Sequence, residues 1–186
     1  YIAGNRLTPA GIAPVCEALA EDGQVEQLWL KRNPLGPVGC LSLANMLRSN
    51  THLIVLDLTN TAILHDGAVA ILSSLGYRSK SPQASCAVRA NSTLRHLYLD
   101  ANGLGVDTAK VVSEYLSTGK NSLVTLSLAC NRLGNEGVRY IADAMKLDTS
   151  VQRLVLASVG MGVVGAQCVA GMLRANTSLL HLDLGL

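Results

Sequence analysis

The stretch LVTLSLACNRLGNEG, residues 123–137, decides the fold of this chain. It places leucines at its first, fourth and sixth positions, an asparagine at the ninth and a further leucine at the eleventh. The same spacing, in full or degraded form, starts at residues 25, 53, 94, 123 and 151, and partial copies open and close the chain. Successive starts lie 28 or 29 residues apart except for one step of 41, so a repeated unit builds the chain.

Each unit is predicted to contain one strand and one helix. Apolar and polar residues alternate over residues 27–31, which is the two-residue period of a strand with one buried face. Apolar residues then recur at spacings of three and four, as at Ile141, Ala142 and Met145, which indicates an amphipathic helix. Neighbouring strands in a stack lie about 4.8 Å apart, whereas neighbouring helices need about 10 Å. This difference bends the stack so that the helices lie on the outside. The predicted fold is an α/β solenoid of about seven repeats, a horseshoe segment with a parallel sheet on its concave face and helices on its convex face.

The ninth position of the unit carries asparagine in four copies. There the side-chain amide can satisfy buried backbone groups of its own loop and of the neighbouring loop. The expected structural ladder consists of Asn5, Asn33, Asn102 and Asn131. Thr61 and Val159 interrupt it. Because a hydroxyl replaces part of the bonding and valine replaces none, the loop at Val159 is predicted to be the least well held.

The pattern Leu-x-Leu-x-x-Asn-x-Leu-Gly-x-x-Gly at residues 126–137, in units of 28 or 29 residues, resembles the ribonuclease-inhibitor class of leucine-rich repeats. The resemblance covers essentially the whole chain. The repeat pattern also resembles the repeat domains of NOD-like receptors, of the Ran GTPase-activating protein and of tropomodulin-type actin regulators. It implies a surface for a protein partner on the concave face and adjoining loops. It implies neither catalysis nor a cofactor, because the fixed positions are structural.

The composition fits a single leucine-rich repeat domain over residues 1–186. Of the 186 residues, 49% are hydrophobic and 15% are charged, and the net charge of +2 argues against a dedicated nucleic-acid surface. No apolar run approaches the roughly 18 residues that a membrane span needs. Because the chain has no phenylalanine and only 3% aromatic residues, its core is predicted to be aliphatic.

The first and last residues fall inside expected strands, which suggests a fragment of a longer protein. Uncapped ends would expose apolar repeat surface, through which two copies could associate. The five cysteines include no Cys-x-x-Cys pair and are interpreted as reduced thiols. Cys16, Cys40 and Cys168 are expected on helices. Reduced thiols favour a cytoplasmic location.

Two patterns that suggest chemistry are better explained by the repeat. The motif Gly-x-Gly-x-x-Gly at residues 160–165, followed by Asp183, resembles a dinucleotide-binding fingerprint. Its last glycine, however, lies in the same repeat position as Gly137. His96 and His181 share a strand position, but three repeats separate them by about 14 Å, too far to share a metal ion. The sequence predicts no catalytic residue and no metal site.

Strand residues that alternate with the buried leucines must face the open side of the sheet. In the first four rows they include the single tryptophan, two tyrosines and several charges, which is the composition of an interface hot spot. The predicted partner-binding residues are Trp29, Lys31, Asp57, His96, Tyr98 and Asp100. The alternative is a chance scatter of ordinary surface residues.

The one long step places an insertion at about residues 76–88, between a helix and the next strand. The stretch from residue 67 to residue 99 contains no acidic residue and carries a charge of +4. The insertion is interpreted either as a tolerated surface loop or as a binding or phosphorylated loop.

The primary functional hypothesis is a non-enzymatic scaffold for protein recognition within a larger cytosolic receptor or adaptor. One alternative is an activator of a small GTPase, which would resemble the Ran GTPase-activating protein. That family depends on N-terminal loops and an acidic tail, which this sequence does not contain. The other alternative is an actin-regulatory repeat module.

Overall fold

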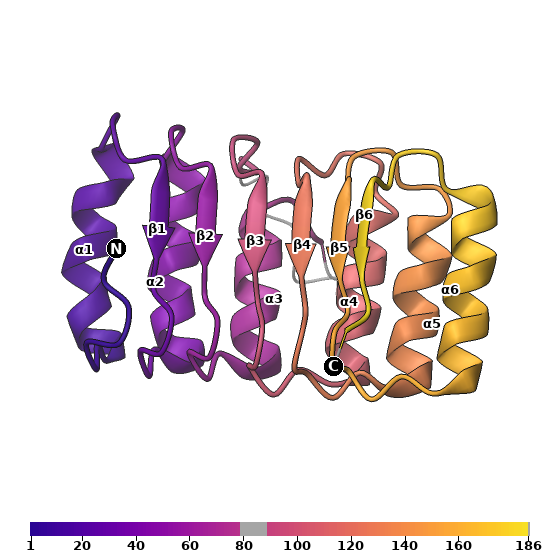
Figure 1. Cartoon of the computed structure of the whole chain (residues 1–186). Helices are drawn as coiled ribbons and strands as arrows, with labels where there is room; N and C mark the ends of the chain where they lie inside the picture. Colours follow the sequence, from indigo (N-terminus) through magenta and orange to yellow (C-terminus); the bar gives the residue numbers. More distant parts are fainter. Residues whose placement is uncertain (79–88, 186) are drawn as a thin grey trace.

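The computed structural model describes residues 1–78 and 89–185, in which strands and helices alternate (Figure 1). The described strands are β1 (Gln27–Trp29), β2 (Val55–Asp57), β3 (His96–Tyr98), β4 (Thr125–Ser127), β5 (Arg153–Val155) and β6 (His181–Asp183). The described helices are α1 (Pro9–Glu21), α2 (Gly36–Ser49), α3 (Leu64–Ser74), α4 (Val106–Leu116), α5 (Gly134–Met145) and α6 (Val163–Ala175).

Neighbouring strands pair in parallel, in the order β1 to β6. The register aligns equivalent residues of successive repeats, for example Leu28 with Leu56 and Leu56 with Leu97. The helices cover one face of the sheet, and their row is wider than the row of strands, as a curved stack requires (Figure 1). The predicted α/β solenoid, with its sheet on the open side, is confirmed.

The helices are short and bury one side. The longest in the described residues, α2, has 14 residues, and its buried side chains include Cys40, Leu43 and Leu47. These follow the spacing of three and four that the sequence shows. Among the described helices, none has the length and apolar character needed to cross a membrane.

The start of the chain adds no seventh strand to those described. It runs beside β1, where the N–H groups of Ile2 and Gly4 donate to the carbonyls of Trp29 and Lys31. Two such bonds hold an extended segment without making a regular strand. The expectation that the chain begins inside a strand is therefore wrong, although Tyr1 still aligns with Trp29.

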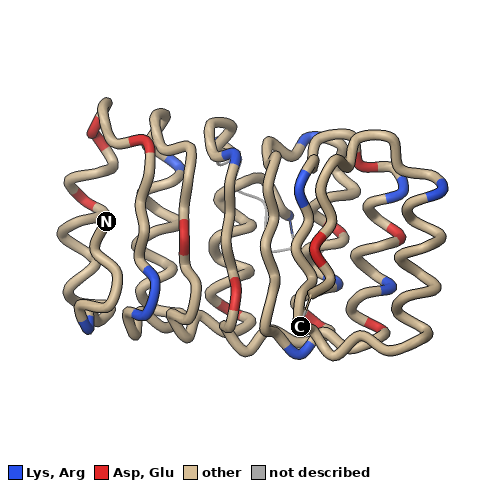
Figure 2. Tube along the Cα trace, in the orientation of Figure 1, with Lys and Arg blue, Asp and Glu red and all other residues tan. Residues whose placement is uncertain are grey.

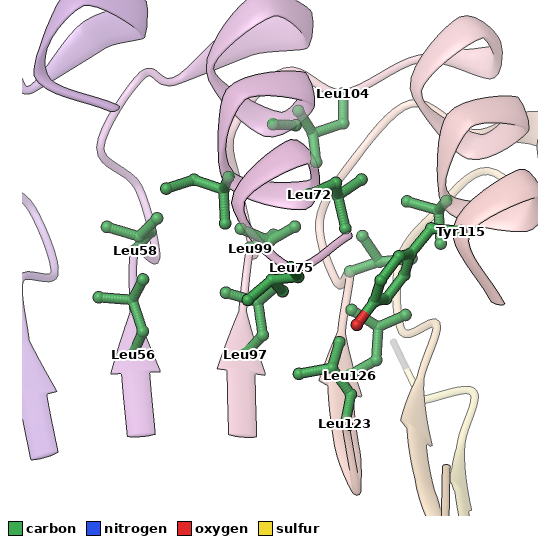
Figure 3. Close-up of a cluster of buried hydrophobic side chains, with 14 of the residues drawn as sticks. Leu56, Leu58, Leu72, Leu75, Leu97, Leu99, Leu104, Tyr115, Leu123 and Leu126 are labelled. Atoms are coloured by element: carbon green, nitrogen blue, oxygen red, sulfur yellow. The ribbon is translucent and has the colours of Figure 1, made fainter. Parts of the chain in front are cut away.

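The core lies between the sheet and the helices. Strand residues such as Leu97 and Leu126 are fully buried and pack with Leu72 and Tyr115 from the helices (Figure 3). Such burial contributes about 25 cal/mol per Å² of apolar surface. The expectation of a purely aliphatic core is wrong, because Tyr115 is 1% exposed and Tyr77 is 8% exposed. Both lie where α3 and α4 pack less closely than other neighbouring helices, and long aromatic side chains fill that wider layer.

The predicted insertion begins later than expected. Tyr77 is buried, its N–H donates to the carbonyl of Leu72, and its hydroxyl donates to Glu114 Oε2 at 3.1 Å. The first two residues of the predicted 76–88 segment therefore belong to the packed body. Residues 79–88 of the segment, which include Cys86, lie outside the described residues.

In the predicted asparagine ladder, Asn131 makes the most complete set of hydrogen bonds. Its Oδ1 accepts the N–H groups of Asn102 and Leu104, both at 3.0 Å. Its Nδ2 donates to the carbonyls of Leu99 at 3.0 Å and Leu128 at 2.8 Å. Asn102 bonds in the same manner to the loop that precedes it. Each amide thus ties its own repeat to the previous one.

The other ladder positions differ in strength. The side chain of Asn33 bonds to two repeats, while the side-chain amide of the exposed Asn5 donates only within its own loop. Thr61 keeps part of the bonding, since its hydroxyl donates to the carbonyl of Leu58 at 2.6 Å. Val159 is buried and has no polar side-chain atom. The weaker hold on its loop stays a prediction.

A second ladder, which the sequence reasoning missed, lies at the opposite ends of the strands. It consists of Asn50, Asn91 and Asn176. Nδ2 of Asn91 donates to the carbonyls of Leu47 and Asn50, and its Oδ1 accepts the N–H groups of Thr93 and Leu94. The available signal was a polar residue three positions before the first leucine of the unit, which looked like an ordinary loop residue.

The last repeat is less covered than the inner ones. Leu184 is 39% exposed, whereas Leu99 and Leu128 at the equivalent position are at most 1% exposed. Leu180 is 80% exposed. Association of two copies through this end stays a prediction.

Candidate protein-recognition surface

Side chains on the open face of the sheet form columns that run across the strands. The parallel register aligns Trp29 with Asp57, Asp57 with Tyr98, and Tyr98 with Ser127. The central column consists of Tyr1, Trp29, Asp57, Tyr98, Ser127, Val155 and Asp183. Because neighbouring strands lie about 4.8 Å apart, the side chains of one column contact one another.

Between Trp29 and Ser127, large and small side chains alternate along the central column. Trp29 on β1 and Tyr98 on β3 flank Asp57 on β2, and Asp57 is 0% exposed. Ser127, beyond Tyr98, is only 2% exposed. Long side chains on neighbouring strands lean over the short ones between them. Asp57 was expected to face solvent as a contact residue, and this expectation of exposure is wrong.

Three aromatic rings form a row, the aromatic row of Tyr1, Trp29 and Tyr98. The centroids of Tyr1 and Trp29 lie 6.2 Å apart with 32° between the ring planes. Those of Trp29 and Tyr98 lie 6.1 Å apart with 24° between the planes. The second contact bridges β2, so the rings cover the residue beneath them. Such ring pairs contribute about 0.5–1.5 kcal/mol beyond their burial.

A lysine and a buried carboxylate support the aromatic row. Lys31 Nζ lies 3.1 Å from Asp57 Oδ2 and 5.4 Å from the centre of the Trp29 ring. Asp57 Oδ1 accepts the N–H of Thr59 at 2.9 Å. Solvent does not reach the carboxylate: Oδ1 accepts a hydrogen bond, whereas Oδ2 has the ion pair with Lys31 and no hydrogen bond among the described residues. These contacts fix the ammonium group and hold the Trp29 ring in place.

Asp100 lies beside this cluster, at the end of β3. Its Oδ1 accepts the hydroxyl of Ser127 and, at 2.8 Å, the N–H of Ala129. Burial raises the pKa of the Asp100 carboxyl above its ordinary value, and the negative charge of Asp57 adds to this effect. The hydrogen bonds and Lys31 oppose it. Asp100 is thus a carboxylate whose charge is only partly compensated.

We expect Asp100→Asn to change how stability depends on pH. Above the ordinary pKa of 3.8 and up to the raised value, folded protein binds more protons at this site than unfolded protein does. The site therefore lowers the free energy of unfolding as pH rises through that window. Urea unfolding at about pH 4 and about pH 7 should show the variant gaining stability relative to the wild type at the higher pH. Glu21→Gln, which removes an exposed carboxylate, is the control, and equal differences at both pH values would contradict the expectation.

His96 lies in the column beside the central one. Its Nδ1 is 2.9 Å from Thr125 Oγ1. Burial, with a contribution from the charge of Arg95, lowers the pKa of His96, which favours the neutral ring. The predicted set therefore divides: Trp29, Lys31, Asp57 and Tyr98 form one contact cluster, with Asp100 next to it. His96 lies at its border.

The glycine motif at residues 160–165 has a structural explanation. Asn135 Oδ1 accepts the N–H groups of Gly162 at 2.8 Å and Gly165 at 2.9 Å. A Cβ atom at Gly165 would lie 2.6 Å from Met161 Cγ, so this position excludes a side chain. Because an asparagine already occupies the donors that a phosphate would need, the motif serves the packing of repeats.

Comparison with known proteins supports the repeat. The sequence profile of the Leucine Rich repeat family matches residues 49–72 and 119–142. "NACHT, LRR and PYD domains-containing protein 14" of Mus musculus is 32% identical over 94% of this chain and 16% of its own length. The ribonuclease inhibitor of Mus musculus is 28% identical over 98% of this chain and 38% of its own length. The chain thus spans well under half of each of these relatives.

Solved structures of similar shape carry the same fold. Leiomodin-1 Actin-Binding Site 2 superimposes with a TM-score of 0.64 over 77% of each chain, at 16% sequence identity. The tropomodulin C-terminal domain of Caenorhabditis elegans gives a TM-score of 0.60 over 88% of this chain and 92% of the other, at 17% identity. At such identities the likeness concerns the fold.

Proposed function

Because this chain is a leucine-rich repeat protein of the ribonuclease-inhibitor type, we propose that it is a non-enzymatic recognition module that binds a protein partner on the open face of its sheet. The aromatic row, with Lys31 and Asp100, forms the centre of the proposed contact. His96 lies at the border of this contact. Trp and Tyr are the residues that contribute most often to interface energy.

One observation carries this proposal: the only tryptophan of the chain is partly exposed yet fixed on both sides. Tyr1 and Tyr98 flank its ring, and Lys31 lies over it. A surface that served no partner would gain little from ordering aromatic side chains in this way. A preorganised row loses little side-chain entropy on binding, which favours affinity.

The polar groups of this surface fit binding better than catalysis. The Asp57 carboxylate is covered and paired, and the His96 ring contacts Thr125. A catalytic base must be able to reach the proton that it removes. The side chains of the proposed surface instead hold one another, which favours a scaffold over an enzyme.

Replacing both Trp29 and Tyr98 by alanine should weaken the capture of a partner by about tenfold or more, because two central aromatic anchors are lost. The measurement uses the chain as immobilised bait and compares each captured protein between variants by quantitative mass spectrometry. Tyr140→Ala is the matched control, since this tyrosine lies on α5 beside Arg139, away from the sheet. Partners that bind the double variant and the control equally would contradict the proposal.

An actin-regulatory role is the second candidate. It is favoured by the fold likeness to Leiomodin-1 Actin-Binding Site 2. Co-sedimentation of the chain with filamentous actin, and its effect on actin assembly, would distinguish the two. Binding to actin that survives the Trp29, Tyr98 double substitution would favour the second candidate. A role as a small-GTPase activator stays a prediction of the sequence.

The proposal also includes a cytosolic location. Four cysteines in the described part of the chain, Cys16, Cys40, Cys130 and Cys168, are free. Cytosolic proteins keep their thiols reduced, so unpaired thiols support this location. Burial raises the pKa of Cys16 and Cys40 to about 12 each, which keeps both thiols protonated and unreactive.

A further inference from the structure

We infer that the aromatic row binds a proline-rich segment in the polyproline II conformation, with a basic residue beside the prolines. This inference rests on the proposed function and names the chemistry of its partner. Polyproline II segments characteristically dock on surfaces lined by aromatic rings, because the preformed helix loses little entropy there. Tyr1, Trp29 and Tyr98 provide such a surface across β1 and β2.

The spacing of the rings fits this helix. Polyproline II has three residues per turn and rises about 3.1 Å per residue, so it is three-sided. Two of its edges rest on a flat surface, and residues i and i+2 on those edges lie about 6.2 Å apart along the axis. The ring centroids of Tyr1 and Trp29 are 6.2 Å apart, and those of Trp29 and Tyr98 are 6.1 Å apart, so either pair of rings matches one such step. Because residues i, i+2 and i+4 lie on three different edges, the helix meets one pair of rings through the two edges that face the sheet.

The row also supplies hydrogen-bond donors. The backbone of polyproline II makes no internal hydrogen bonds, so its carbonyls need outside donors. The hydroxyls of Tyr1 and Tyr98 have no hydrogen-bond partner among the described residues. Trp29 Nε1 makes only a 3.3 Å bond to Gln27 Oε1, in an exposed position. All three rings can therefore donate to a bound peptide.

The charges beside the row select a basic neighbour. Lys31 pairs directly with Asp57, so it compensates the charge of Asp100 only in part. Figure 2 shows few charged residues along the strands, with acidic ones on β2 and beyond β3 and a basic one at the end of β1. Asp100 Oδ1 accepts hydrogen bonds from Ser127 and Ala129, whereas no group of the described residues donates to Oδ2. An arginine or lysine next to the prolines complements this carboxylate.

Trp29 itself provides the measurement, because it is the single tryptophan of the chain. Its fluorescence is followed during titration with a synthetic peptide of ten prolines that ends in two arginines. A second peptide ends in two glutamates, and a third replaces the prolines with alternating glycine and serine. We expect a saturable change with the first peptide, binding at least about threefold tighter than the second and at least about tenfold tighter than the third.

Three variants separate the contributions. Tyr98→Ala should weaken the arginine-tailed peptide by about fivefold, and Tyr98→Phe, which keeps the ring, by about twofold. Asp100→Asn keeps the oxygen that accepts from Ser127 and Ala129, and it should bring the two proline peptides within about twofold of each other. Tyr140→Ala should change nothing. Circular dichroism melting of each variant verifies that it folds.

The inference is overturned if no peptide gives a saturable change, if the glycine-serine peptide binds as well as the prolines, or if Tyr98→Ala binds undiminished. Failure with all peptides, combined with loss of a captured partner in the Trp29, Tyr98 double variant, would leave the recognition surface standing and reject only the proline-rich ligand. If no peptide binds and the double variant still captures every partner, both the recognition surface and the proline-rich ligand are rejected.

Discussion

Asn131→Ala is expected to lower the free energy of unfolding by about 3–5 kcal/mol, because one amide satisfies backbone groups in two repeats. Its Oδ1 accepts two N–H groups and its Nδ2 donates to the carbonyls of Leu99, Leu128 and Ala129. Asn131 is 3% exposed, so water cannot replace these bonds without opening the loop. Urea denaturation followed by circular dichroism gives the free energy directly.

Two comparisons make the expectation specific to the ladder. Asn131→Thr should lose about half as much, because Thr61 shows that a hydroxyl can still donate to the carbonyl of its own strand. Asn5→Ala should cost less than about 1 kcal/mol, because Asn5 is exposed and water can take over its bonds. Equal losses at Asn131 and Asn5 would mean that the ladder does not hold the repeats together.

Asp57→Lys should destabilise the fold by a similar amount, about 3–5 kcal/mol, since it places a second ammonium group beside Lys31 in a site without solvent. The substitution removes the carboxylate that lies 3.1 Å from Lys31 Nζ and adds bulk beneath Trp29 and Tyr98. Asp57→Asn should be milder, because the Lys31 side chain is 36% exposed and its ammonium group can turn to water.

Asp183→Lys is the matched control for this reversal. Asp183 occupies the same column on β6, and its Oδ1 accepts the N–H of Gly185 as that of Asp57 accepts the N–H of Thr59. It is not covered by rings on both sides, so its reversal should cost less than about 1 kcal/mol. Thermal melting of the three variants decides the matter, and similar melting temperatures for both reversals would show that the cover over Asp57 has no energetic weight.

The repeat period predicted most of the fold because stacked repeats put equivalent residues in equivalent places. Leu97, Leu126 and Asn131 each occupy the site that their position in the unit assigns. Tyr77 and Tyr115 escaped prediction because they fill the wider layer beside the long unit, where the period itself is broken.

The candidate surface was only half predictable. Alternation along a strand gives the direction of each side chain, so Trp29 and Tyr98 were placed on the open face correctly. The alternation does not tell whether long side chains on the neighbouring strands lean over a residue and bury it. Asp57 was therefore expected to be exposed, and the contact between two rings across it became apparent only in three dimensions.

The second asparagine ladder has a consequence for sugar attachment. Asn91-Ser-Thr and Asn176-Thr-Ser both match the Asn-x-Ser/Thr acceptor for N-linked glycans. A glycan would be joined to Nδ2, yet in the fold Nδ2 of each asparagine donates to two backbone carbonyls of the preceding repeat. A sugar at either residue and a closed ladder exclude each other. The same polar spacing that stacks the repeats thus produces glycosylation signals that the folded chain cannot use.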